Sequence, residues 1–159
     1  MKNYRVPTLT IAGSDSSGGA GIQADLKTFS AIGTYGMSVI TAITAQNTEG
    51  VFDVEELSSE IIKSQIKAVC EDIPPKAIKI GMVSSPKIIK DIVESLEIYP
   101  CEYVVVDPVM ISKSGYSLLR PESKENLIKY LIPKAYIVTP NVPEAEEISN
   151  IKIKTIEDM

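Results

Sequence analysis

The strongest constraint on the fold is the order in which short apolar runs alternate with amphipathic segments. Runs rich in apolar or β-branched residues predict strands, and they lie at 8–12, 38–45, 77–81, 103–107 and 135–139. Segments with helical spacing of apolar residues follow them, at 22–33, from about 58, after 86, from 121 to 133 and from 143 to 148. Parallel strands need long crossovers, which helices supply. The order therefore predicts an α/β fold: a mostly parallel sheet with helices on both faces.

Composition excludes several classes of function. The net charge is −5 with acids and bases interspersed, so the chain has no basic stripe for nucleic acid. It contains no histidine, which excludes Ser-His-Asp and Cys-His catalysis and histidine zinc sites within the chain. Cys70 and Cys101 either form a disulfide or remain reduced thiols. Residues 1–7 carry no apolar signal core and no run is long enough to span a membrane, so we expect a cytoplasmic protein. The oligomeric state stays open, a homodimer included.

Candidate site residues lie at the ends of the predicted strands. In open α/β sheets, ligands bind outside the carboxyl ends of parallel strands, which gather on one edge. We therefore expect one site to be built from the residues at those ends, namely Gly13, Gln46, Met82, Asp107 and Thr139.

The glycine-rich segment 13–21 leads from the first strand into a helix. Such loops let backbone N–H groups approach a polar ligand, although a tight turn without a ligand fits the same residues. A Walker A loop is excluded because Gly18 is not followed by lysine. A dinucleotide fingerprint at 19–24, with Glu49 as the ribose acid, would start too far from the strand end. Asp25 lies one turn inside the helix, as a ligand-binding acid or as a solvated first-turn acid.

Polar residues also follow three of the later predicted strands. In 46–48 an amide can both donate to and accept from a heterocycle edge. Asp107 suits either a magnesium-bound phosphate or a hydrogen bond that fixes its loop. The segment 111–115 fits a lid or a plain surface loop. Asn141 and Glu144, three residues apart at a helix start, fit a magnesium site through water or a capping box.

Taken together, these motifs resemble the hydroxymethylpyrimidine and phosphomethylpyrimidine kinases of thiamine biosynthesis. The resemblance runs from about Leu9 to Glu147 without a large gap, and its motifs lie at 10–29, 36–42, 45–48, 79–82, 107–110 and 139–144. It implies a ribokinase-like fold and ATP-dependent phosphorylation of a pyrimidine alcohol and then of its monophosphate.

The resemblance also implies roles for the matched residues. Gln46 would hydrogen-bond the pyrimidine ring, Asp25 and the Gly13 backbone would hold its polar substituents, and Met82 and Val109 would form apolar walls. ATP and its phosphates would lie against Asp107, Thr139, Asn141 and Glu144, and Mg²⁺ against Asp107 and Glu144. A metal bridge and backbone donors carry most of such a phosphoryl transfer.

One departure from the family pattern limits these expectations. The family carries a second, Gly-Thr-Gly segment that forms the anion hole and activates the hydroxyl, and a downstream lysine; neither is in this chain. Residues 155–158 also read as a helix start just before the last residue. We therefore expect a single, incomplete ribokinase-like α/β domain over 1–159, shortened at its C-terminal side and poorly active alone.

Three other functions compete with the pyrimidine kinase. A pyridoxine or pyridoxal kinase shares the 13–21 loop, and the Gln46-Asn47-Thr48 segment favours the pyrimidine branch over it. A chain that ends naturally at Met159 would instead be a non-catalytic heterocycle-binding module. A dehydrogenase is the most distant alternative.

Overall fold

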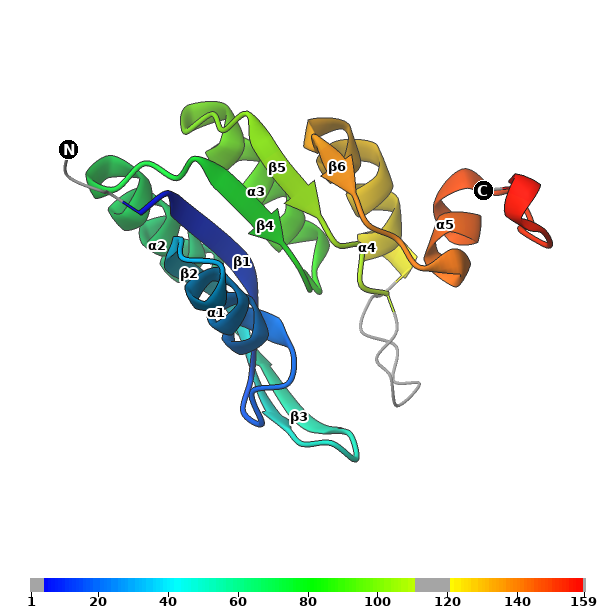
Figure 1. The fold of residues 1–159 in the computed structure, drawn as a ribbon, viewed down its shortest axis with the longest axis horizontal. Helices are drawn as coiled ribbons and strands as arrows, with labels where there is room; N and C mark the ends of the chain where they lie inside the picture. Colours follow the sequence, from blue (N-terminus) through cyan, green and yellow to red (C-terminus); the bar gives the residue numbers. More distant parts are fainter. Residues whose placement is uncertain (1–4, 111–120, 159) are drawn as a thin grey trace.

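The computed structural model describes residues 5–110 and 121–158 (Figure 1). Its strands are β1 Pro7–Asp15, β2 Tyr35–Gln46, β3 Val51–Glu56, β4 Ala77–Ile80, β5 Tyr103–Val106 and β6 Ile137–Val138. Its α-helices are α1 Gly21–Ala31, α2 Ser59–Asp72, α3 Pro86–Ile98, α4 Pro121–Asn126 and α5 Val142–Ser149. A π-turn at Leu127–Leu131 and a 3-10 turn at Ile132–Lys134 continue α4, and a last 3-10 turn covers Ile156–Asp158. The segment 111–115, considered above as a lid, lies outside the described residues.

The strands form one sheet in the order β3-β2-β1-β4-β5-β6. Every neighbouring pair is parallel except β2 and β3, which are antiparallel. The predicted α/β fold with a mostly parallel sheet is therefore confirmed. The carboxyl ends of the five parallel strands share one edge of the sheet, where the candidate residues were expected.

Helices lie on both faces of the sheet, but one face is covered only over β1 and β2, and β4, β5 and β6 have no helix on that side in the described part of the chain (Figure 1). The main core lies on the face covered by α2, α3 and the π-turn. Alternate residues of the strands point toward this face. Its fully buried members are Leu9, Ile11, Val39, Ile62, Ile80, Val83, Ile89, Ile92, Val106, Leu127 and Leu131. Burying one such side chain contributes about 1.5–3 kcal/mol, so this layer holds the sheet edge in place. On the other face, α1 covers β1 and β2.

The starts of α2 and α3 follow ordinary capping chemistry. Ser58 caps α2, and its Oγ accepts a hydrogen bond from the Ile61 N–H. Ser85 caps α3 by accepting from the Ile88 N–H, with Pro86 in the first turn. A capping serine satisfies an N–H group that the helix leaves without a partner.

None of the helices in 5–110 and 121–158 is long and apolar enough to cross a membrane.

The prediction from sequence missed one strand and placed the end of another too early. The strand β3 was not predicted, because it is an edge strand whose side chains are exposed or half-buried and show no apolar alternation. The glycine-rich segment is not a loop from residue 13, because β1 resumes its pairing after a bulge, with Ser14 opposite Ile43. Of the two alternatives left open for the cysteines, the structure has the reduced one, because Cys70 and Cys101 are both free thiols.

Candidate active site at the carboxyl edge of the sheet

The loop after β1 is organised around the carboxylate of Asp15, which is buried. One of its oxygens accepts hydrogen bonds from the backbone N–H and the Oγ of Ser17, both at 2.8 Å. The other accepts from the N–H groups of Gly19 at 2.9 Å and Ala20 at 2.7 Å. Burial raises the pKa of Asp15, but these hydrogen bonds outweigh it and leave the pKa below its ordinary value. The carboxylate therefore fixes the loop in its ionised form.

The start of α1 packs against the end of β1. Gln23 donates from Nε2 to Ser14 Oγ at 2.7 Å and accepts from the Asp15 N–H at 2.8 Å. Gly21 has φ +54°, and a Cβ there would lie 2.3 Å from the carbonyl oxygen of Gly13. Only glycine fits that position, so the helix can begin directly beside the strand end.

The end of β2 and the segment after β4 reach the same place. A Cβ on Gly13 would lie 2.7 Å from Met82 Cε, so Met82 covers the Gly13 backbone. Gln46 is joined to the loop through Ser16, whose Oγ donates to the Gln46 carbonyl and accepts from its N–H, both at 2.8 Å. Thr44 Oγ1 lies 2.7 Å from the Ser14 carbonyl oxygen and 3.3 Å from Gln46 Oε1. Gly13, Gln46 and Met82 therefore gather around one loop.

Asp25 points from α1 toward the sheet and not into solvent. Its Oδ2 accepts from Thr10 Oγ1 at 2.6 Å and from Lys79 Nζ at 3.1 Å. The same ammonium lies 3.6 Å from Asp107 Oδ2. The side chain of Asp25 is 17% exposed, which rules out the solvated first-turn acid. One lysine on β4 thus joins the acid from α1 to the acid after β5.

Asp107 lies among more negative than positive charge. Burial raises its pKa; the charge of Lys79 opposes this, while those of Glu144 and Asp25 raise the pKa further, and the net shift is upward. The carboxylates of Asp107, Asp25 and Glu144 share the single ammonium of Lys79, so this region carries an excess of negative charge. A cation bound there would remove that excess.

The capping-box alternative for Asn141 and Glu144 is confirmed. Asn141 Oδ1 accepts from the Glu144 N–H and Glu144 Oε2 accepts from the Asn141 N–H, both at 2.9 Å. Glu144 Oε1 also accepts from the Met110 N–H at 3.3 Å, which ties α5 to the segment after β5. Glu144 is buried, and each of its oxygens already accepts one hydrogen bond.

The remaining predicted residues lie at the same edge, held by backbone contacts. The Val109 N–H donates to the Asp107 carbonyl at 2.8 Å, and the Thr139 N–H donates to Val106 at 3.0 Å. Sequence reasoning gave no separate role to Asp15, Gln23 or Lys79. For Lys79 a signal was available, because a lysine between two isoleucines is unusual in a strand that is predicted to be covered on both faces.

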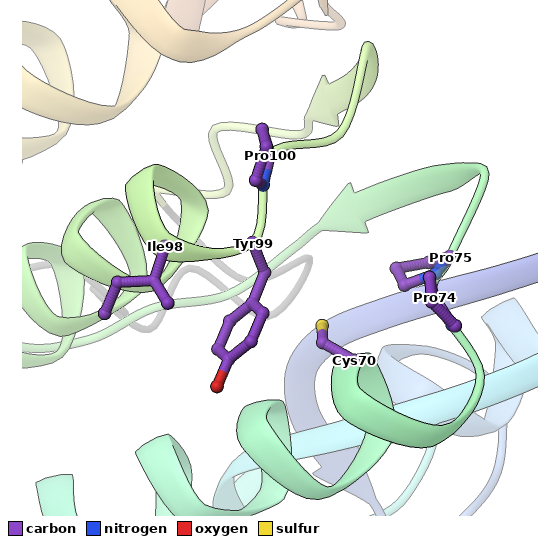
Figure 2. Close-up of a pocket in the computed structure, with 6 residues that line it drawn as sticks. All are labelled: Cys70, Pro74, Pro75, Ile98, Tyr99 and Pro100. Carbon is purple, nitrogen blue, oxygen red and sulfur yellow. The ribbon is translucent and has the colours of Figure 1, made fainter.

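A cavity of about 230 Å³ lies elsewhere (Figure 2). It is lined by Cys70, Pro74, Pro75, Ile98, Tyr99 and Pro100. These residues precede β4 and β5, so the cavity is at the amino edge of the sheet, opposite the residues described above. It has no charged lining residue and is not the candidate site.

Comparison with known proteins decides the family. The sequence profile described as phosphomethylpyrimidine kinase matches residues 15–159. The chain belongs to the phosphomethylpyrimidine kinase family. A hydroxymethylpyrimidine/phosphomethylpyrimidine kinase from Bacillus subtilis is 52% identical over 150 residues, which cover 94% of this chain and 55% of the relative. One from Rhizobium meliloti is 58% identical over 137 residues, 86% of this chain and 51% of the relative. This family member thus spans about half the length of those curated relatives.

Solved structures agree with this assignment. The phosphomethylpyrimidine kinase of Clostridium difficile 630 superposes with a TM-score of 0.93 at 77% identity, over 97% of this chain and 67% of that one. A Staphylococcus aureus pyridoxal kinase in complex with AMP-PCP and pyridoxal matches at 43% identity and TM-score 0.85, over 98% of this chain and 56% of that one. The expected ribokinase-like α/β fold is confirmed by these matches.

Proposed function

We propose that the protein phosphorylates 4-amino-5-hydroxymethyl-2-methylpyrimidine and then its monophosphate, using ATP, in thiamine biosynthesis. The observation that carries the proposal is that the carboxyl ends of β1, β2, β4 and β5, together with α1, meet at one edge of the sheet in a member of this family. A ligand site at the carboxyl ends of parallel strands is the usual arrangement in such folds.

The pyrimidine is proposed to bind beside the loop after β1. Gln46 would hydrogen-bond the ring edge, with Met82 and Val109 as apolar walls. Asp25 and the Gly13 backbone would hold the ring substituents; the lysine and threonine contacts on Asp25 Oδ2 direct its other oxygen to such a role. Packing the flat faces of the ring between apolar side chains while hydrogen-bonding its polar edge gives both affinity and orientation.

The nucleotide side is proposed to lie around Asp107, Thr139, Asn141 and Glu144. These residues suit Mg²⁺ in charge and donor type, since carboxylate oxygens are its usual protein ligands. Asp107 would bind the ion directly. Glu144, with both oxygens engaged by N–H groups, would reach it through water. When bound, Mg²⁺ would neutralise phosphate charge during transfer.

No group of three or more acidic or thiol side chains able to hold a metal occurs among residues 5–110 and 121–158. A Mg²⁺ ion held by Asp107 would therefore take most of its other ligands from phosphates and water. We further propose that residues 1–159 form one domain of this enzyme and that it works in the cytoplasm, where ATP is available.

A pyridoxal kinase is the second candidate. The 43% identity to a pyridoxal kinase solved in complex with AMP-PCP and pyridoxal supports it, since the two chains share the fold and much of the sequence. One experiment separates the candidates: the protein as the cell makes it is given ATP, Mg²⁺ and either hydroxymethylpyrimidine or pyridoxal, and the products are followed by ³¹P NMR. We expect pyrimidine monophosphate and then diphosphate. Phosphorylation of pyridoxal alone would contradict the proposal. If neither compound is phosphorylated, both candidate functions are wrong.

A further inference from the structure

Lys79 occupies an unusual place for a lysine. It lies in β4, a central strand, between Ile78 and Ile80, which are buried in the main core on the opposite face. Its neighbours in the register are Thr10 on β1 and Val105 on β5. The side chain is 23% exposed. A lysine held this far from solvent needs acidic partners to keep its charge favourable.

Its two partners come from opposite sides of the candidate site. Asp25, on the proposed substrate side, lies 3.1 Å from the ammonium. Asp107, on the proposed phosphate side, lies 3.6 Å from it. The charges of Asp25 and Glu144 act on Asp107 directly. Without the lysine, these carboxylates would repel one another in a partly buried space, and Asp25 would keep only the Thr10 hydroxyl on Oδ2.

The backbone beside Lys79 leaves room for its ammonium. A Cβ on Gly81 would lie 2.8 Å from Lys79 Nζ and 3.0 Å from the Ala12 Cβ. Gly81 is two residues further along the same strand direction, so its missing side chain is the space that the ammonium fills. The position of the charge is therefore set by two residues, a lysine and a glycine.

We propose that Lys79, in the space left by Gly81, is a positioning residue that holds the substrate-side and phosphate-side carboxylates in one arrangement. It fixes Asp25 with one oxygen directed to the pyrimidine substituents, and it keeps Asp107 from repelling Asp25. The inference rests on the proposed function, because it assigns Asp25 to the alcohol substrate.

The test measures hydroxymethylpyrimidine binding by calorimetry, without ATP or metal, on the protein as the cell makes it. Lys79→Met should weaken binding by at least about tenfold, since it removes one of the two contacts that fix Asp25 Oδ2. Gly81→Ala keeps the lysine but displaces the ammonium, and should weaken binding roughly three- to tenfold. The control is Lys63→Met, which removes another ion-paired lysine, bound to Asp91 at 2.8 Å between α2 and α3. It should change affinity by less than about twofold.

A double-mutant cycle separates positioning from general stability. If Lys79 acts through Asp25, Lys79→Met should cost less than about twofold in an Asp25→Asn background. Equal losses in both backgrounds would overturn the inference, as would a Lys79→Met protein that binds like the wild type. Should Lys79→Met fail to fold, a folded Gly81→Ala variant with wild-type affinity would overturn it. If the wild type neither binds nor phosphorylates the pyrimidine, the proposed function fails first and the inference with it. If the wild type phosphorylates the pyrimidine but Lys79→Met and Gly81→Ala bind it with wild-type affinity, the inference is wrong and the proposed function stands.

Discussion

Replacing Asp15 by asparagine should disorder the glycine-rich loop and destabilise the protein. The carboxylate accepts four hydrogen bonds, two on each oxygen. Asparagine keeps one oxygen and turns an NH₂ group toward the two donors on the other side. Two hydrogen bonds to a charged acceptor are lost and buried donors face one another, which costs about 2–4 kcal/mol of unfolding free energy. For a chain of this size, that lowers the Tm by roughly 5–15 °C.

Urea unfolding of wild type and Asp15→Asn at pH 7 measures this difference. Hydrogen exchange should show faster exchange at the Gly19 and Ala20 amides in the variant. The control is Asp53→Asn, an exposed aspartate whose Oδ1 accepts from the adjacent Val54 N–H. It should change stability by less than about 0.5 kcal/mol. An Asp15→Asn variant as stable as the control would refute the assignment of the carboxylate as the loop anchor.

The same contacts predict a pH dependence. Because the pKa of Asp15 is lower in the folded protein, its ionised form stabilises the fold above the unfolded pKa, near 3.8. That contribution disappears as the pH falls through the folded pKa. The stability gap between wild type and Asp15→Asn should be constant from pH 7 to about 5 and shrink below about 4. A gap that widened with acid would show that the carboxylate is destabilising in the fold.

Three further perturbations follow from the same structure. Gln46→Ala should weaken pyrimidine binding by roughly 1–3 kcal/mol in calorimetry, since it leaves a polar ring edge without a partner; unchanged affinity would remove Gln46 from the site. Ile89→Ala, at a fully buried position, should cost about 2–5 kcal/mol in urea unfolding, whereas Ile98→Ala, at a side chain 68% exposed, should cost far less; equal effects would contradict the described core. Asp91→Asn should cost about 1–3 kcal/mol by thermal unfolding, because it weakens the contacts of the buried Asp91 carboxylate to Ser59 and Lys63; a neutral effect would contradict them.

The parallel strands could be predicted because each is an apolar run between turn residues. The helices between them could be predicted from the helical spacing of their apolar residues. β3 could not, since an edge strand buries too little to impose alternation on its sequence. The extension of β1 to Asp15 could not either. Glycine and serine predict a loop locally, and the pairing of Ser14 with Ile43 across the sheet overrides that tendency.

For the candidate site, the sequence predicted which residues would gather but not how they contact one another. Topology alone brings Gly13, Gln46 and Met82 to one edge. Nothing in the order of residues tells that Asp25 faces Lys79 and not solvent, because that depends on the angle at which α1 lies on the sheet. The Asn141–Glu144 spacing was ambiguous for the opposite reason: a capping box and a metal site use the same side chains.

A crystal structure of the protein as the cell makes it, with bound hydroxymethylpyrimidine, tests the central claim most directly. We predict electron density for the ring against the loop after β1, within hydrogen-bonding distance of Gln46 and Asp25 and in contact with Met82. Density for the ring in the cavity at the amino edge of the sheet, or with those three side chains turned away from it, would contradict the account.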